Sequence, residues 1–202
     1  MRRLRLAGFA LALLLIVALG TWYIRWCYPY GMRHGYLATM SVALRLYAQD
    51  HGGWYPAGAG SPLRSLQLVH WDYMGFPHAL AGLSGDVDET IRRVKAGGAI
   101  DESVSSWVYW EGFRRDDDPQ LAILWERVGG VGFNGRRIEA GAHSVLFADG
   151  QMGTVWACDW SEFLAKQEAL RTAILDKHRS TLHKGGRAVQ GSGANHSIVP
   201  NL

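Results

Sequence analysis

Residues 7–24 read AGFALALLLIVALGTWYI, and residues 36–50 read YLATMSVALRLYAQD. The first stretch is almost wholly apolar, with Thr21 and Tyr23 as its only polar side chains, and it is just long enough to cross a bilayer as a helix. The second stretch repeats apolar residues every three or four positions, as a helix with one buried face does. Together they predict an anchor helix followed by an amphipathic helix that forms the spine of a folded domain.

The charges outside the first few residues balance. Arg2, Arg3 and Arg5 are three of the 21 Lys and Arg residues, so the other 18 equal the 18 Asp and Glu residues. The net charge of +3 therefore reports a basic head, and no basic surface for nucleic acid is expected. By the positive-inside rule, this head lies in the cytoplasm and the domain lies outside. We expect a single-pass protein of the inner (cell) membrane whose partner is the lipid bilayer.

A cleaved signal peptide is the alternative to a retained anchor. Ala18-Leu19-Gly20 has the small-x-small pattern of a cleavage site. The apolar run is longer than a typical signal core, which favours retention. Aromatic residues also gather at the end of the run, as they do at membrane interfaces. They are Trp22, Tyr23, Trp26, Tyr28 and Tyr30.

The rest of the chain predicts an α+β fold, in which the spine helix packs on a small antiparallel sheet and a C-terminal helix follows. Asp149-Gly150 is a strong hairpin signal between the last two strands. Strands are predicted at 104–110, 121–128, 144–148 and 153–157, and further helices at 62–69, 86–96 and from 159 to about 177. The segment 70–85 is predicted to be irregular.

Three regions are expected along the chain. Residues 1–28 form the basic head and the transmembrane anchor, and residues 29–178 form the extracytoplasmic domain. Residues 179–202 are rich in Gly, Ser, His and basic groups without an apolar face, so a disordered tail is expected. Cys27 and Cys158 are predicted to be free thiols, one of them buried, because Cys27 lies beside the membrane and far from Cys158 in the chain.

The densest group of carboxylates is Asp116-Asp117-Asp118, followed by Pro119. Clustered aspartates in a loop can hold a hard cation such as Ca²⁺ through oxygen ligands. The alternative is a solvated turn, in which each Asp bonds its own backbone and Pro119 directs the exit. Calcium at these three residues is the one candidate metal site, and no other cofactor is expected.

Two further patterns bear on catalysis. Residues 130–135 spell G-x-G-x-x-G, but a dinucleotide site needs a helix directly afterwards, and the chain leads to a strand instead. His143 and Asp149 lie near Glu139 and could form an acid–base set, although the hairpin already gives Asp149 a structural role. The sequence carries no G-x-S-x-G or H-E-x-x-H motif. We therefore expect no catalytic residues and no enzyme.

Two blocks of sequence resemble a known family. Residues 43–56, ALRLYAQDHGGWYP, resemble the segment after the transmembrane helix in bacterial type II secretion pseudopilin-like proteins. Residues 144–150, SVLFADG, resemble the prepilin-type proteins with an H-x9-DG element. Weaker matches lie between them, so the resemblance covers about residues 1–160. Leu13 stands where the family has a glutamate, and Glu139 stands where it has the histidine.

The resemblance implies a structural role. Family members are cut by a prepilin peptidase after a glycine that precedes phenylalanine, which makes Gly8 and Phe9 the candidate processing site. It also implies a pseudopilin-like structural or assembly protein of a bacterial envelope, without catalytic activity, that forms oligomers with itself or with other pilin-like proteins. The alternative is a membrane-tethered module that binds an extracytoplasmic ligand or partner through its Trp-rich sheet.

Overall fold

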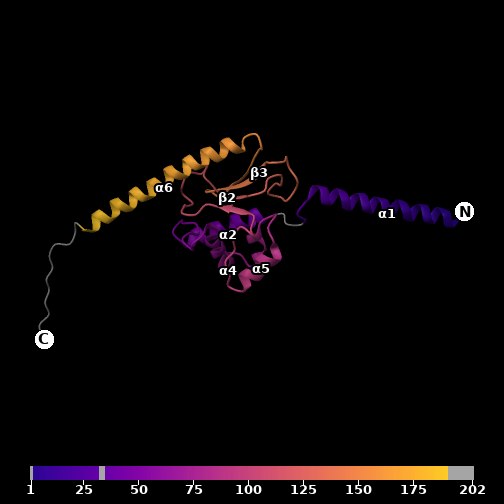
Figure 1. Ribbon diagram of the computed structural model, residues 1–202, viewed down its shortest axis with the longest axis horizontal. Coiled ribbons are helices and arrows are strands. Elements are labelled where there is room, and N and C mark those ends of the chain that lie inside the picture. Colours follow the sequence, from indigo (N-terminus) through magenta and orange to yellow (C-terminus); the bar gives the residue numbers. More distant parts are fainter. Residues whose placement is uncertain (1, 32–34, 191–202) are drawn as a thin grey trace, which may run out of the picture.

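The computed structural model describes residues 2–31 and 35–190 and combines helices with one antiparallel sheet, as Figure 1 shows. The helices are α1 (Arg2–Cys27), α2 (Tyr36–Asp50), α3 (Pro62–Leu66), α4 (His70–Tyr73), α5 (Val87–Lys95) and α6 (Trp160–Gln190), with 3₁₀ turns η1 (Gln67–Val69) and η2 (Pro77–Ala81). The strands are β1 (Trp107–Tyr109), β2 (Ala122–Glu126), β3 (His143–Phe147) and β4 (Met152–Val155). The α+β class is therefore confirmed.

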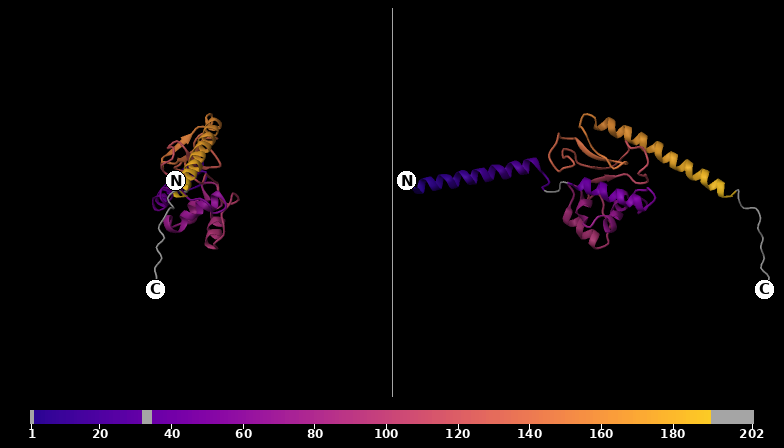
Figure 2. Two further views of the ribbon diagram at one scale, coloured as in Figure 1. Left: turned by 90° about the vertical axis from the view of Figure 1, so that its left-hand side faces the viewer. Right: turned by 180° about the vertical axis from the view of Figure 1, so that it is seen from behind.

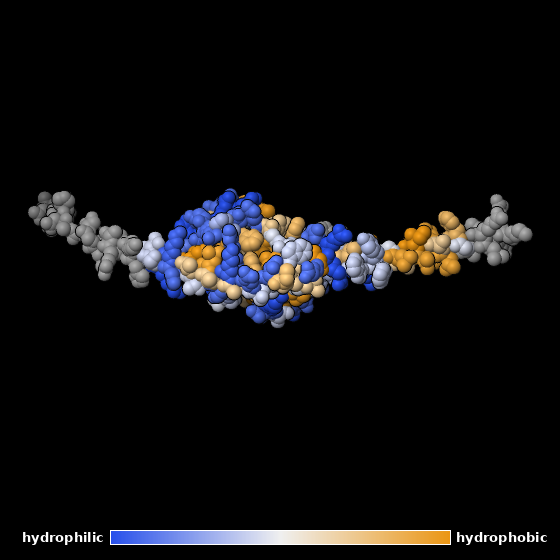
Figure 3. Space-filling view, turned by 90° about the horizontal axis from the view of Figure 1, so that it is seen from above, coloured by the Kyte–Doolittle hydropathy of each residue, from blue (hydrophilic) through white to orange (hydrophobic). Residues whose placement is uncertain are grey.

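Helix α1 leaves the body of the molecule as a single apolar rod (Figures 1 and 3). Its segment Gly8–Cys27 is the one described helix long and apolar enough to cross a membrane, and the same properties fit a signal sequence. The side chains from Gly8 to Trp26 are all exposed. A turn at 28–31 then ends the helix, where Pro29 and the left-handed Gly31 (φ +68°) disfavour its continuation.

The sheet is a meander with strand order β1-β2-β3-β4, and all neighbouring strands are antiparallel. The predicted hairpin joins β3 and β4: Gly150 adopts a positive φ of +88° and donates its N–H to the carbonyl of Phe147. A shift in register between Ala122 and Leu124 places one extra residue in β2. Every residue of β2 is buried, as expected for an inner strand with both faces covered.

The two faces of the sheet are covered by different helices (Figures 1 and 2). Leu124 and Leu146 face the main core, which α2 enters through Met40, Leu44 and other residues of its apolar stripe. Trp125 and Val145 face the opposite way and pack beneath the start of α6. The pairs Leu124–Leu146 and Trp125–Val145 alternate between the two faces as pleated strands do, whereas Ile123 and Leu124 share the core face because of the extra residue in β2. The spine helix predicted at 36–50 therefore lies on one face, and the C-terminal helix lies on the other.

The helices after α2 lie close to their predicted positions. Residues 62–69 form α3 and η1, and the hydroxyl of Ser61 accepts a hydrogen bond from the N–H of Arg64. The side chain of Asp86 caps α5 in the same way, through the N–H of Glu89. The segment 70–85 is less irregular than expected, because α4 and η2 form within it and bury Leu80 among the core residues.

The C-terminal helix is longer than the sequence predicted. The sequence predicts a helix that ends near Lys177 and disorder from residue 179, whereas α6 continues to Gln190. No glycine or proline interrupts 160–184, and local bonds support this stretch, including that from the Thr181 hydroxyl to the carbonyl of Lys177. Residues 191–202, the rest of the predicted tail, lie outside the described residues. Both cysteines are free thiols, Cys27 buried and Cys158 exposed, as predicted.

Candidate functional site

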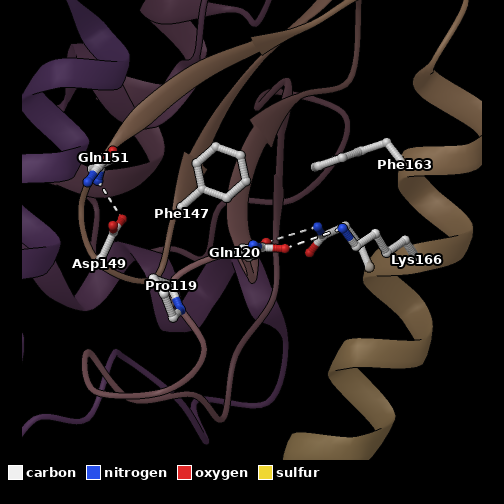
Figure 4. Close-up of a pocket in the computed structure, with 8 residues that line it drawn as sticks. Pro119, Gln120, Phe147, Asp149, Gln151, Phe163 and Lys166 are labelled. Carbon is white, nitrogen blue, oxygen red and sulfur yellow. Dashed lines mark hydrogen bonds between the residues drawn. The ribbon is translucent and has the colours of Figure 1, made fainter.

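A groove of about 390 Å³ opens between the first half of α6 and the end of the sheet where β3 turns into β4 (Figure 4). Its apolar walls include Phe147 of β3 and Phe163 of α6, whose ring centroids lie 6.3 Å apart with nearly perpendicular planes. Polar groups surround these rings. The lining residues are Pro119, Gln120, Phe147, Asp149, Gln151, Phe163, Lys166 and Gln167.

Helix α6 forms one wall of the groove because Phe163, Lys166 and Gln167 are three and four residues apart and share a face. Gln167 is fully buried and bonds to the backbone of the sheet at both ends of its amide. Its Oε1 accepts the N–H of Ala122 at 2.8 Å, and its Nε2 donates to the carbonyl of Gln120 at 2.9 Å. Gln167 therefore attaches α6 to the start of β2 and leaves no polar group for a ligand.

The opposite wall is the β3–β4 turn. Asp149 accepts the N–H of Gln151 through its Oδ1 at 2.9 Å, which is the local bond that aspartate makes in a tight turn. Lys166 reaches the side chain of Gln120 through its Nζ at 3.3 Å. Both charged groups are thus anchored at the margin of the groove. A small aromatic ligand or a partner side chain would meet two phenyl rings, one ammonium and one carboxylate there.

The three aspartates of the predicted calcium site do not converge. Asp116 lies 3.1 Å from the guanidinium of Arg114, and Asp118 accepts the N–H of Gln120. Asp117 accepts the N–H of Arg114 with one oxygen and faces Nε2 of His178 with the other, at 2.9 Å. Among the residues that the structure describes, no group of three or more acidic, histidine or cysteine side chains could hold a metal ion. Each carboxylate instead has a neighbour in the protein.

His143, Asp149 and Glu139, the candidate acid–base residues, each have a different structural environment. His143 is buried and stacks on Trp160 with ring centroids 3.8 Å apart, while its Nδ1 lies 2.9 Å from the carbonyl of Glu126. Asp149 serves the hairpin turn, and Glu139 lies exposed in the loop before β3. The G-x-G-x-x-G segment is a glycine-rich connection without a following helix, as predicted, and the N–H of Gly132 bonds to the carbonyl of Arg136.

A buried carboxylate that the sequence analysis missed lies at the end of β2. Glu126 is 2% exposed and accepts the N–H of Leu83 at 2.5 Å and the hydroxyl of Ser106 at 2.6 Å. A Cβ at Gly82 would lie only 2.2 Å from that hydroxyl, so glycine is required there for the close approach. These bonds tie the segment after η2 to the sheet, which is a structural role.

The two blocks of the family resemblance contact each other in the fold. Tyr55, in the turn after α2, donates its hydroxyl to the carbonyl of Ala148 beside the β3–β4 turn, at 2.6 Å. Burial raises the pKa of this phenol to about 12. Ser41 of α2 donates to the carbonyl of Gly150 at 3.0 Å. The spine helix and the hairpin turn therefore hold each other in place.

The candidate processing residues Gly8 and Phe9 lie on the free part of α1. Both are exposed, and a Cβ added at Gly8 would contact nothing within 4 Å. No other described element covers this part of the helix, so it is sterically accessible to an enzyme or to a neighbouring helix.

In comparisons with known proteins, no family model, curated protein or solved structure matches the chain. The functional argument therefore rests on the sequence and on the geometry described above. Among the residues that line the groove, the sequence analysis discusses only Asp149 and Pro119 individually. One signal for Gln167 was present: it is a polar residue on the apolar stripe of a helix, between Phe163 and Leu170.

Proposed function

We propose that this protein is a pseudopilin-like structural or assembly component of a bacterial envelope, without catalytic activity of its own. Helix α1 anchors it in the inner membrane as a single span, with the basic head in the cytoplasm and the α+β domain outside. The protein associates with further copies or with other pilin-like proteins, and it needs no cofactor for this role.

The observation that carries this proposal is the unpartnered helix α1. About 20 apolar residues cost free energy when they stay exposed to water, at roughly 25 cal/mol per Å² of apolar surface. The side chains from Gly8 to Trp26 are exposed, so the body of the protein does not cover this apolar surface. A bilayer or neighbouring helices of the same kind would remove that surface from water. Lateral contacts between such helices favour small residues, and Ala10 and Ala12 of α1 follow the candidate cleavage site, so a processed protein keeps them.

The order of elements supports the same proposal. A free apolar helix is followed by a spine helix, α2, that packs on an antiparallel meander. The hydrogen bond from Tyr55 to Ala148 joins the two segments that carry the family resemblance, and Ser41, just before the first segment, bonds to Gly150 in the second. The resemblance thus involves residues that contact one another in three dimensions, although they are about 90 residues apart in the chain.

The first experiment is the intact mass of the protein purified from its native membrane. If a prepilin peptidase processes it, residues 1–8 are missing, with or without methylation at the new N-terminal Phe9. The Gly8→Leu variant then keeps the full mass, whereas Gly20→Leu, which lies deeper in the anchor, is processed normally. A loss ending near Gly20 would instead identify a cleaved signal peptide and contradict the anchor.

The second experiment separates assembly from simple tethering. The double variant Ala10→Leu/Ala12→Leu leaves Gly8 and Phe9 unchanged and keeps α1 apolar, but it adds bulk where small residues allow close approach. Chemical cross-linking in the membrane should show fewer oligomers for this variant, while Leu14→Ile behaves as the wild type. Unchanged cross-linking in both variants, with both still in the membrane fraction, would contradict assembly through α1.

The groove beside α6 favours a second candidate, a membrane-tethered binding module. Its pair of phenyl rings beside Lys166 suits a small aromatic carboxylate or an aromatic partner side chain. Ligand-observed NMR with a set of aromatic carboxylates on the full chain in nanodiscs tests it. Binding that is lost in Lys166→Gln and kept in Lys177→Gln, a change outside the groove, would favour this role.

A further inference from the structure

Residues 129–142 form a loop within the connection between β2 and β3, and this loop is attached to the end of α1. Arg137 donates its backbone N–H to the carbonyl of Cys27 at 2.7 Å and its side-chain Nε to the carbonyl of Trp26 at 3.0 Å. Its guanidinium also lies over the ring of Trp26, 5.7 Å from the centroid. The last carbonyls of a helix lack donors within the helix, and a cation there complements the helix dipole. Arg137 therefore caps α1.

This cap determines where the loop lies relative to a membrane. The candidate span is Gly8–Cys27, so the two capped carbonyls belong to its last two residues. If α1 crosses the bilayer, Arg137 is held at the level where the hydrocarbon ends and the headgroups begin. Figure 1 and the right-hand view of Figure 2 both show this loop at the end of the body where α1 joins it.

The tip of the loop carries an exposed aromatic residue beside an arginine. The N–H of Gly132 bonds to the carbonyl of Arg136, which closes a tight turn with Phe133 at its start. Phe133 is 44% exposed, and Arg136 is exposed. Phe133 is four residues from Arg137, so the Cα atoms of these two residues lie within about 14 Å of each other.

The charges around this tip are mostly positive. Arg25 is exposed in the last turns of α1, and Arg136 and Arg137 lie in the loop. Glu139 is the one acidic residue between 129 and 142. Aromatic side chains prefer the interface of a bilayer, and basic side chains near it are attracted by anionic headgroups. The loop thus combines the two features of a membrane-surface contact at the place where a membrane surface is expected.

We propose that the tip of the 129–142 loop contacts the bilayer surface, with Phe133 in the headgroup region and Arg136 on the phosphates of anionic phospholipids. This inference rests on the proposed membrane span of α1 and adds to it a second point of contact. Two contacts would restrict the tilt of the domain, so that the same face of it is presented to partners along the membrane.

The test uses the full chain in nanodiscs with one photoreactive residue, benzoylphenylalanine, at a single position. It replaces Phe133 in the test protein, Leu14 in an anchor control, and Arg179 in a second control. Arg179 is exposed and lies on the half of α6 at the opposite end of the molecule from α1 (Figure 1). After irradiation, mass spectrometry counts the phospholipid adducts in discs of phosphatidylcholine and in discs containing phosphatidylglycerol.

We expect lipid adducts at positions 133 and 14 and only background at 179. Adducts at 133 should increase with phosphatidylglycerol, and Arg136→Gln should reduce that increase by about fivefold, the factor for one basic residue near an anionic surface. Adducts at 14 should not depend on Arg136.

Each other outcome has a distinct meaning. Adducts at 14 with only background at 133 would overturn the loop contact and leave the anchor intact. No adducts at 14 would overturn the membrane span and with it the proposed function. Cross-links from 133 to a second protein copy in place of lipid would overturn the membrane contact and identify a protein interface.

Discussion

Gln167 shows how one side chain determines the docking of a helix. Its amide bonds two backbone groups, at Ala122 of β2 and at Gln120 in the turn before it, and it is fully buried. Gln167→Leu would keep the volume but leave these buried groups without partners, which costs about 2–3 kcal/mol. Urea unfolding of the full chain in detergent should show a lower midpoint. Ala165→Gln, an exposed change on the same helix, should unfold as the wild type, and equal midpoints for both variants would contradict this role.

Tyr55 makes the stability of the fold sensitive to alkaline pH. Its buried phenol has a pKa raised from 10.0 to about 12, so the folded state holds its proton more tightly than the unfolded state. This contribution is complete below about pH 10 and is lost as the pH rises through 12. Tyr55→Phe should be less stable by about 1 kcal/mol at neutral pH, through loss of the bond to Ala148.

The difference in stability between the two proteins should then narrow between pH 10 and 12, because Tyr55 ionises there in the unfolded wild type while the folded state still holds its proton. Thermal unfolding at a series of pH values measures it. A constant difference across that range would show that Tyr55 does not titrate as its burial implies.

At the scale of elements, α6 is held at both ends of its contact with the body. Trp160 packs on the sheet at one end, and His178 faces Asp117 and the ring of Trp54 at the other. Sequence analysis placed His178 at the last position of the predicted domain and gave it no partner. The contact could not be predicted from the sequence, because Asp117 and Trp54 are far from His178 in the chain and come close to it only in the folded structure.

Removing this second contact should loosen the free half of α6. In His178→Ala, backbone amides from about residue 176 onward should exchange hydrogen five- to tenfold faster, as expected for a loss of roughly 1 kcal/mol. Arg179→Ala removes only an exposed pair with Asp176 and should change exchange by less than about twofold. Equal exchange rates in the two variants would contradict a stabilising contact between His178 and Asp117.

At the scale of the whole molecule, Cys158 allows a test of the membrane orientation that we propose. Its thiol is exposed, and Cys27 is buried. A hydrogen bond with Asp159 raises the pKa of Cys158, so labelling should accelerate as the pH rises. We expect a membrane-impermeant maleimide to label intact spheroplasts at Cys158 and not to label Cys158→Ser. Labelling only after lysis would place the domain in the cytoplasm.

The sequence by itself determined the local features of this protein. The apolar run that becomes α1, the amphipathic α2, the caps at Ser61 and Asp86 and the Asp149-Gly150 hairpin all follow from residues close together in the chain. Periodicity, capping and turn preferences act over a few residues, which is why such features can be read in advance.

Only the tertiary structure decided which distant residues meet. Asp117, a candidate cation ligand in the sequence, lies against His178 in the fold. Gln167 links α6 to β2. Arg137 becomes the cap of α1 across more than a hundred residues of chain. Each depends on packing between separate elements. The free energy of a buried polar group is set by the partner that the fold brings to it.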